Sequence, residues 1–307
     1  MRIEDFFNLV PFENNLAVAG DFAIEHKGVD RYLVSCSGGD IVVDLNDGVE
    51  VVPPYPVDID YVPGGLAKMG IEVLGGASGF STDEPCTGLA LCYNGDYLLI
   101  DSIPFLDRLL FARGISSNQV SALFLTHLHD DHCSMFPLME MPHRVEVITT
   151  EEIFNMAMEK LACSLGWSIE VVREHFQLLR VNPGDSLNYY GLNIEVHNTV
   201  HTIPTIGATF STVHKGTFRD VCVVGDNQNM SAVRGMAEAG IVRQQTLENL
   251  ERLYRHNFHL LIADGGAGEI HGDPADSLKS QAERVVFVHV DKVPDALQTT
   301  FSLASAG

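Results

Sequence analysis

The sequence predicts an α/β fold preceded by a β-rich extension, and two patterns predict it. Near the N-terminus, short runs with strand character, such as 31–36 and 40–44, are separated by glycine turns. From residue 71 onward, apolar strand-like runs alternate with segments of helical spacing. We therefore divide the 307 residues into a β-rich N-terminal extension, 1–68, and a main domain, 69–307.

The strands of the main domain are predicted from short apolar runs that end in turn or polar residues. The pair Asn94-Gly95 marks a hairpin between two of these runs. The predicted strands lie at 71–74, 88–93, 97–101, 121–126, 193–197, 220–224, 259–263 and 284–289.

The helices are predicted from start and stop signals as well as from periodicity. Pro104 suits the first turn of a helix, and Gly114 suits its end. Thr149 and Glu152 have the spacing of a capping box, which predicts that a helix starts there. The predicted helices lie at 104–113, 150–164, 168–179 and 243–256.

The composition narrows the class of protein. Hydrophobic residues make up 46% of the chain and charged residues 20%, which is typical of a globular protein. No apolar run approaches the roughly 18 residues of a membrane span, and Glu4 and Asp5 stand where a signal peptide carries bases. We therefore expect a cytoplasmic protein without a membrane partner. The formal charge of −22 disfavours polyanions, so a nucleic-acid partner is not expected.

The strongest chemical signal is the run T-H-L-H-D-D-H at residues 126–132, directly after a predicted buried strand. A strand end followed by a tight turn can aim alternate side chains at one point. We therefore expect His127 and His129 to hold one metal ion, while Asp131 and His132 face a second. Neutral imidazoles with few carboxylates are typical of zinc, although manganese and iron accept the same ligands.

Three further residues are candidate ligands because of their places at predicted strand ends. His201 follows one strand, and His289 ends an apolar strand, where an unpaired imidazole would be costly. Asp226 follows Gly225, which allows the backbone to approach an ion closely, and its carboxylate could bridge two metals. Each residue alone has an ordinary structural explanation, and the signature at 126–132 is what favours a metal role.

His271 is a candidate catalytic residue. It stands in a loop just before Asp273, which resembles a helix N-cap. Asp264 lies seven residues earlier at a predicted strand end and could orient an imidazole. We expect His271 to donate a proton or to stabilise developing charge. His197, the alternative to His201 as a ligand, lies inside a predicted strand and is interpreted as structural.

These motifs resemble the metallo-β-lactamase superfamily. The signature at 126–132 is complete, and His201, Asp226 and His289 follow in the order of that superfamily. The resemblance covers roughly 70–295. It implies a four-layer αββα sandwich, with the metal ions at one edge between the two sheets.

Within the superfamily, the chain looks closest to the ribonuclease Z and cyclic-nucleotide phosphodiesterase branch. The segments that carry this resemblance are the glycine-rich loop 75–79, the strand end 98–101, the motif 201–207 and the loop 271–276. The resemblance implies that the loop beginning at His271 is catalytic.

The residues and the resemblance together predict a hydrolase with two divalent metal ions, of which zinc is the first expectation. Asp131 would aim the attacking water, and His271 would protonate the leaving group. The expected substrate is a small phosphodiester such as a cyclic nucleotide, and a homodimer is left open. The alternatives are a metallohydrolase of thioesters, lactones or lactams, a non-catalytic metal or ligand sensor, and an RNA-processing nuclease, which the charge disfavours.

Overall fold

The structure is a computed structural model, and it describes residues 10–45, 52–59, 68–266, 268, 270–290 and 302–304. The chain forms two compact units, Met1–Pro53 and Pro54–Gly307. This division lies earlier than the predicted boundary at residue 68. The assignment of the segment between the two positions to the extension therefore stays a prediction.

The first unit contains an antiparallel sheet in which each strand pairs with the next along the chain. Its strands are β1 (Leu16–Ala19), β2 (Phe22–Gly28), β3 (Arg31–Cys36) and β4 (Gly39–Asp44). The strands predicted at 31–36 and 40–44 are confirmed. Ile24, Val34 and Ile41 lie in register across three strands and form an apolar row on one face.

The second unit is built around two sheets. In the described residues, the first sheet has the strand order β10-β9-β8-β7-β6-β5. Strands β7 to β10 run parallel, and β5 and β6 complete the sheet as antiparallel neighbours. The strands are β5 (Met69–Gly75), β6 (Gly88–Tyr93), β7 (Asp96–Ile100), β8 (Val120–Phe124), β9 (Val145–Thr149) and β10 (Phe176–Arg180).

The second sheet follows the chain order β11 to β17 among the described residues. Its first four strands are antiparallel, and its last four pair in parallel. The strands are β11 (Ser186–Tyr189), β12 (Leu192–Asn198), β13 (Ile206–His214), β14 (Thr217–Val223), β15 (Leu260–Asp264), β16 (Val285–Val288) and β17 (Ser302–Leu303).

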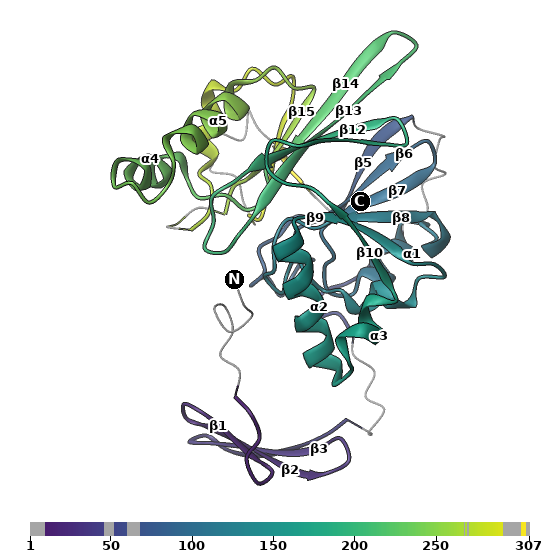
Figure 1. The fold of residues 1–307 in the computed structure, drawn as a ribbon, viewed down its shortest axis with the longest axis vertical. Helices are drawn as coiled ribbons and strands as arrows, with labels where there is room; N and C mark the ends of the chain where they lie inside the picture. Colours follow the sequence, from purple (N-terminus) through teal and green to yellow (C-terminus); the bar gives the residue numbers. More distant parts are fainter. Residues whose placement is uncertain are drawn as a thin grey trace. The chain divides into compact units, whose positions relative to one another are not determined.

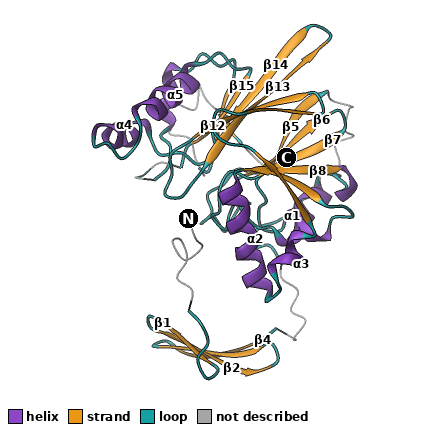
Figure 2. Ribbon diagram, in the orientation of Figure 1, coloured by secondary structure: helices purple, strands orange, loops and turns teal. Residues whose placement is uncertain are grey.

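Helices cover the outer faces of the two sheets (Figure 1). The same layering is visible when the elements are coloured by type (Figure 2). Between the sheets, the ring of Phe124 on β8 meets the ring of Phe210 on β13 edge-on, with centroids 5.6 Å apart. The predicted α/β fold with four layers is confirmed. The helices are α1 (Leu106–Ala112), α2 (Glu151–Leu165) and α3 (Ile169–Arg173) outside the first sheet, and α4 (Met230–Glu238) and α5 (Gln244–Arg255) outside the second.

Helix α5 illustrates how the layers are held. Its buried residues Leu247, Leu250 and Leu253 lie three apart, so they share one face. That face packs into the core cluster that also contains Leu261 of β15 and Phe287 of β16. None of the helices in the described part of the chain has the length and apolar character needed to cross a membrane.

The helix predicted over 168–179 is wrong in its second half. Helix α3 ends at Arg173, and the chain continues as β10, which pairs in parallel with β9. Phe176 is only 1% exposed at the start of that strand. Burial and backbone pairing with β9 therefore outweigh the helical spacing of this segment.

Two predicted helix starts also shift. Thr150, not Thr149, caps α2, because its hydroxyl accepts a hydrogen bond from the Ile153 N–H at 3.2 Å. Thr149 instead ends β9, and its hydroxyl donates to the Leu125 carbonyl at 2.8 Å. The helix predicted from Pro104 begins at Leu106, after a residue in the left-handed conformation. Besides β10, the described strands and α-helices that were not predicted are β1, β2, β9, β11, β13, β17 and α4.

Candidate metal centre

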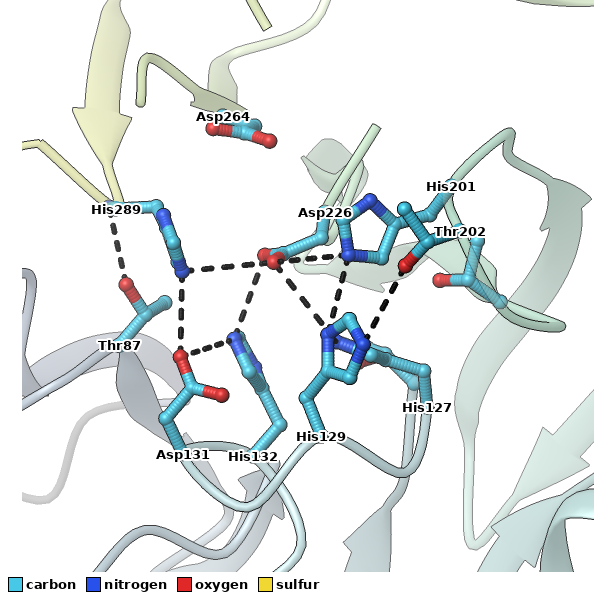
Figure 3. Close-up of polar contacts among 12 residues, drawn as sticks. Thr87, His127, His129, Asp131, His132, His201, Thr202, Asp226, Asp264 and His289 are labelled. Atoms are coloured by element: carbon cyan, nitrogen blue, oxygen red, sulfur yellow. Dashed lines mark hydrogen bonds and ion pairs between the residues drawn. The ribbon is translucent and has the colours of Figure 1, made fainter. Parts of the chain in front are cut away.

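The predicted ligands converge at one end of the two sheets (Figure 3). Each of them follows a strand, so the loops at this edge present their side chains to a common centre. The signature follows β8, His201 follows β12, Asp226 follows β14, and His289 directly follows β16. Their roles as ligands stay predictions, but the geometry can be tested against a metal ion.

A first group of donors surrounds one point. Nε2 of His127 lies 3.1 Å from Nδ1 of His129, and Nε2 of His201 lies 3.2 Å from it. Oδ2 of Asp226 lies 3.8 Å from Nε2 of His127 and 3.7 Å from Nε2 of His201. A tetrahedral ion bound at roughly 2.0–2.1 Å from each donor holds its donors about 3.3–3.4 Å apart. These four side chains therefore fit around one ion.

A second group shares the same aspartate. Oδ2 of Asp131 lies 3.5 Å from Nε2 of His132 and 3.3 Å from Nε2 of His289. Oδ1 of Asp226 lies 3.4 Å from Nε2 of His132, and its Oδ2 lies 3.5 Å from Nε2 of His289. These separations match the same tetrahedral spacing. Asp226 stands between the two groups, where its carboxylate could contribute to both.

Three buried atoms of this cluster lack hydrogen-bond partners among the described residues. They are Nε2 of His132, Oδ2 of Asp226 and Nδ1 of His289. A buried polar atom without a partner costs stability, and most such atoms in folded proteins have one. A divalent cation would satisfy Nε2 of His132 and Oδ2 of Asp226, so the donor set fits a metal ion. Imidazoles mixed with carboxylates suit zinc, manganese or iron.

The electrostatics favour neutral imidazoles in the first group. Burial lowers the pKa of His127 well below its ordinary value, and the neighbouring histidines lower it further. Burial, together with His129 and His271, lowers the pKa of His201 to about 4. Both rings are therefore neutral at pH 7 and have a lone pair free for a metal.

Asp101 contacts a ligand of the second group directly and a ligand of the first group through Thr126. Nδ1 of His132 donates to Oδ2 of Asp101 at 2.8 Å. The hydroxyl of Thr126 donates to the same oxygen at 2.8 Å and lies 2.9 Å from Nδ1 of His127. Such outer partners fix the orientation of a ligating imidazole. Sequence reasoning assigned no role to Asp101 or Thr126, although a carboxylate at the end of an apolar strand was a usable signal.

His271 lies beside the cluster and pairs with Asp264 as predicted from the sequence. Nδ1 of His271 donates to Oδ2 of Asp264 at 3.0 Å. The ring of His271 stacks on that of His289, with centroids 4.2 Å apart. Nδ1 of His271 is also 3.7 Å from Oδ2 of Asp226. The ring is thus held at the edge of the donor cluster, with Nε2 as its remaining nitrogen.

His197 lies outside the cluster. Its Nε2 hydrogen-bonds with the hydroxyl of Thr209 at 2.6 Å inside the second sheet. Among the described residues, no group of side chains that could hold a metal ion includes His197, and its interpretation as a structural residue stays a prediction.

The glycine-rich loop after β5 touches the centre through one residue. A Cβ atom built on Gly79 would lie 2.2 Å from Oδ2 of Asp131 and 2.8 Å from its Cβ. Glycine is needed here because any side chain would occupy the place of the Asp131 carboxylate. The loop therefore packs against Asp131 and fixes the position of its carboxylate.

The architecture is shared with solved structures. The metallo-β-lactamase fold protein YhfI from Bacillus subtilis superposes with a TM-score of 0.58 at 16% identity, covering 78% of this chain and 97% of that one. This chain has the metallo-β-lactamase fold. The predicted resemblance to that superfamily is confirmed.

Relatives by sequence fall in the predicted branch of the metallo-β-lactamase fold. The cGMP-dependent 3',5'-cGMP phosphodiesterase A of Dictyostelium discoideum is 24% identical over 229 residues, which cover 73% of this chain and 26% of that protein. The ribonuclease Z of Methanopyrus kandleri is 28% identical over 127 residues, covering 41% of this chain and 44% of that protein. This chain thus spans about a quarter of the length of the phosphodiesterase. Residues 69–218 match the family described as anti-Pycsar protein Apyc1.

Proposed function

We propose that this chain is a metal-dependent phosphodiesterase that acts on a small phosphodiester, such as a cyclic nucleotide, and binds two divalent metal ions. The observation that carries the proposal is the pair of donor groups that share Asp226, each with the spacing of a metal ligand set. The relatives support the class of reaction, because they include a cyclic-nucleotide phosphodiesterase and a ribonuclease Z.

The first ion would be held by His127, His129 and His201, and the second by Asp131, His132 and His289, with Asp226 contributing to both. Two divalent ions, when bound, would supply a water activated near neutral pH and a clamp on the phosphoryl oxygens. Zinc is the expected metal because imidazoles outnumber carboxylates in this donor set.

The side chains of the protein would then have separate roles in the reaction. The carboxylate of Asp131 accepts a hydrogen bond from the attacking water and aims it at phosphorus. His271, held through its Nδ1 by Asp264, presents Nε2 to the leaving ester oxygen and gives it a proton. Asp101 keeps His132 and, through Thr126, His127 in place.

A small substrate is favoured over RNA. The chain has 41 acidic and 19 basic residues, and this excess of negative charge repels a polyanion. A single phosphodiester carries one charge, which the ions of the centre can offset. The proposed partner is therefore a small molecule rather than a nucleic acid or a membrane.

The test is hydrolysis of bis(p-nitrophenyl) phosphate by the purified full chain, with metal content measured on the same sample. We expect turnover that EDTA removes and that added zinc or manganese restores. Asp131→Ala should abolish turnover. Asp107→Ala is the control, because this carboxylate is exposed on α1 and belongs to neither ligand group. Two bound metal ions without hydrolysis of any phosphodiester would overturn the proposal in favour of carbonyl substrates or a sensor.

A further inference from the structure

A pocket of about 720 Å³ opens beside the first group of donors. His201 and Thr202 form part of its wall, and the hydroxyl of Thr202 lies 3.4 Å from Nε2 of His129. Its size falls within the range of about 300–1,000 Å³ that small-molecule sites occupy. A phosphodiester held at the donor cluster would therefore extend one of its substituents into this pocket.

Part of the pocket wall is apolar. Ile203 and Pro204 line it from the loop after β12, and Ile241 lines it from the loop between α4 and α5. Ile241 is 74% exposed, which is high for an isoleucine. A flat ring system lying against these side chains would cover apolar surface that is now in water.

Several of the polar side chains of the pocket are already engaged by protein groups. The guanidinium of Arg180 pairs with the carboxylate of Glu151 at 3.2 Å. The side-chain amide of Asn198 donates to the hydroxyl of Thr246 at 3.2 Å. These groups have less to offer a ligand than a side chain whose donors are free.

Arg243 is different. It is exposed, lines the pocket at the N-terminus of α5, and makes no side-chain capping hydrogen bond. Within the part of the chain that the structure describes, its guanidinium has no hydrogen-bond or ion-pair partner. In a chain with a formal charge of −22, this pocket thus contains an arginine whose donors remain free for a ligand.

A guanidinium presents two parallel N–H donors, which match two adjacent acceptors on a ligand. Guanine offers such a pair in O6 and N7, whereas adenine places the N6 donor beside N7. We propose that this pocket receives the base of a cyclic nucleotide and that Arg243 selects guanine over adenine. This inference rests on the proposed function, because it assumes that the phosphodiester lies at the donor cluster.

The experiment compares kcat/KM for 3',5'-cGMP and 3',5'-cAMP in the metal-loaded full chain. We expect the wild type to prefer cGMP by roughly tenfold or more, which is the discrimination of one bidentate contact. In Arg243→Gln this preference should vanish or reverse, because a glutamine amide matches N6 and N7 of adenine. The ratio of the two values cancels any general loss of activity in the variant. Cyclic inosine monophosphate, which keeps O6 and N7 but lacks the guanine amino group, should behave as cGMP does.

Arg255→Gln is the matched control. Arg255 ends the same helix, is exposed, and pairs with Glu251 at 3.7 Å, away from the pocket. This variant should keep the wild-type ratio. An equal rate for the two nucleotides in the wild type, or the same ratio in Arg243→Gln, would overturn the inference and leave the phosphodiesterase proposal standing.

Failure of the phosphodiesterase proposal would look different, because no phosphodiester would then be hydrolysed. In that case equilibrium dialysis of labelled cGMP and cAMP against the metal-loaded chain tests the pocket by itself. Tighter binding of cGMP that Arg243→Gln abolishes would support base recognition. Equal binding, or no binding of either nucleotide, would overturn it.

Discussion

Asp101 and His132 form a buried pair in which Nδ1 of the imidazole donates to Oδ2 of the carboxylate at 2.8 Å. The backbone of Asp101 has a φ of 63°, in the left-handed region that asparagine and aspartate tolerate best. The carboxylate thereby reaches His132 and Thr126 at once. We infer that this residue positions the ligands without touching a metal ion itself.

Asp101→Asn tests this positioning role. Asparagine keeps the backbone conformation but replaces one carboxylate oxygen by an amide donor. It therefore cannot accept from the Thr126 N–H on one atom and from His132 and the Thr126 hydroxyl on the other at the same time. We expect metal affinity to fall about 10- to 100-fold, as it does when outer partners of ligands are removed. A zinc titration against a chromophoric chelator measures the change. Asp107→Asn on α1, where the side chain is exposed, is the control, and equal affinities in the two variants would contradict the role.

Gly79→Ala tests the packing of the glycine-rich loop against Asp131. The new methyl group would overlap the carboxylate, so Asp131 must move and the second ligand group must lose its spacing. We expect turnover to fall about 100-fold, the loss that a small misplacement of a catalytic group can cause. Gly235→Ala in helix α4 is the matched control, since nothing lies within 4 Å of its added Cβ. That variant should keep its activity and gain about 0.5–1 kcal/mol of stability.

Removal of the metal ions should destabilise the fold as well as abolish the activity. Without the ions, the buried atoms Nε2 of His132 and Oδ2 of Asp226 would lack partners. The stabilisation of the folded state by the bound ions would also be lost. A ligand present at 1,000 times its Kd stabilises a protein by about 4 kcal/mol. We expect EDTA to lower the Tm of the wild type clearly in a thermal melt. In Asp226→Asn the shift should be smaller, and an identical shift in both proteins would argue against ligation by this residue.

The core behind α5 should be sensitive to truncation. Leu250 is fully buried against the second sheet, so Leu250→Ala leaves a cavity. We expect the free energy of unfolding to drop by about 2–5 kcal/mol in a denaturant titration. The exposed Leu278, at 57%, provides the control. Leu278→Ala should change the stability by less than about 0.5 kcal/mol.

His197 should make stability depend on pH. Burial lowers the pKa of this imidazole below its ordinary value of 6.5, so the unfolded chain binds the proton more readily than the folded one. Stability is then lost as the pH falls through 6.5, and the loss levels off below the pKa of the folded state. We expect the free energy of unfolding of the wild type to fall more between about pH 7.5 and about pH 5 than that of His197→Gln, as measured by denaturant titration at each pH. Parallel curves for the two proteins would contradict this assignment.

Much of the fold could be predicted because local patterns agreed with the tertiary structure. Apolar runs of strand length became β6, β7 and β8, and the leucine spacing of 243–256 became α5. The segment 168–179 shows where this reasoning fails. Its spacing suits a helix, but β9 offered an unpaired edge, and pairing with it decided the outcome.

The sequence by itself determined the chemistry of the centre, because a signature of imidazoles and carboxylates at a strand end is a local property of the chain at 126–132. Only the tertiary structure decided which distant residues join it, since His201, Asp226 and His289 come together through the packing of two sheets. It also decided the roles of Asp101 and Arg243. Arg243 belongs to no motif, and the segment 98–101 gave Asp101 no role. The role of Asp101 depends on contacts, and that of Arg243 on an absence of contacts among the described residues, that sequence spacing does not encode.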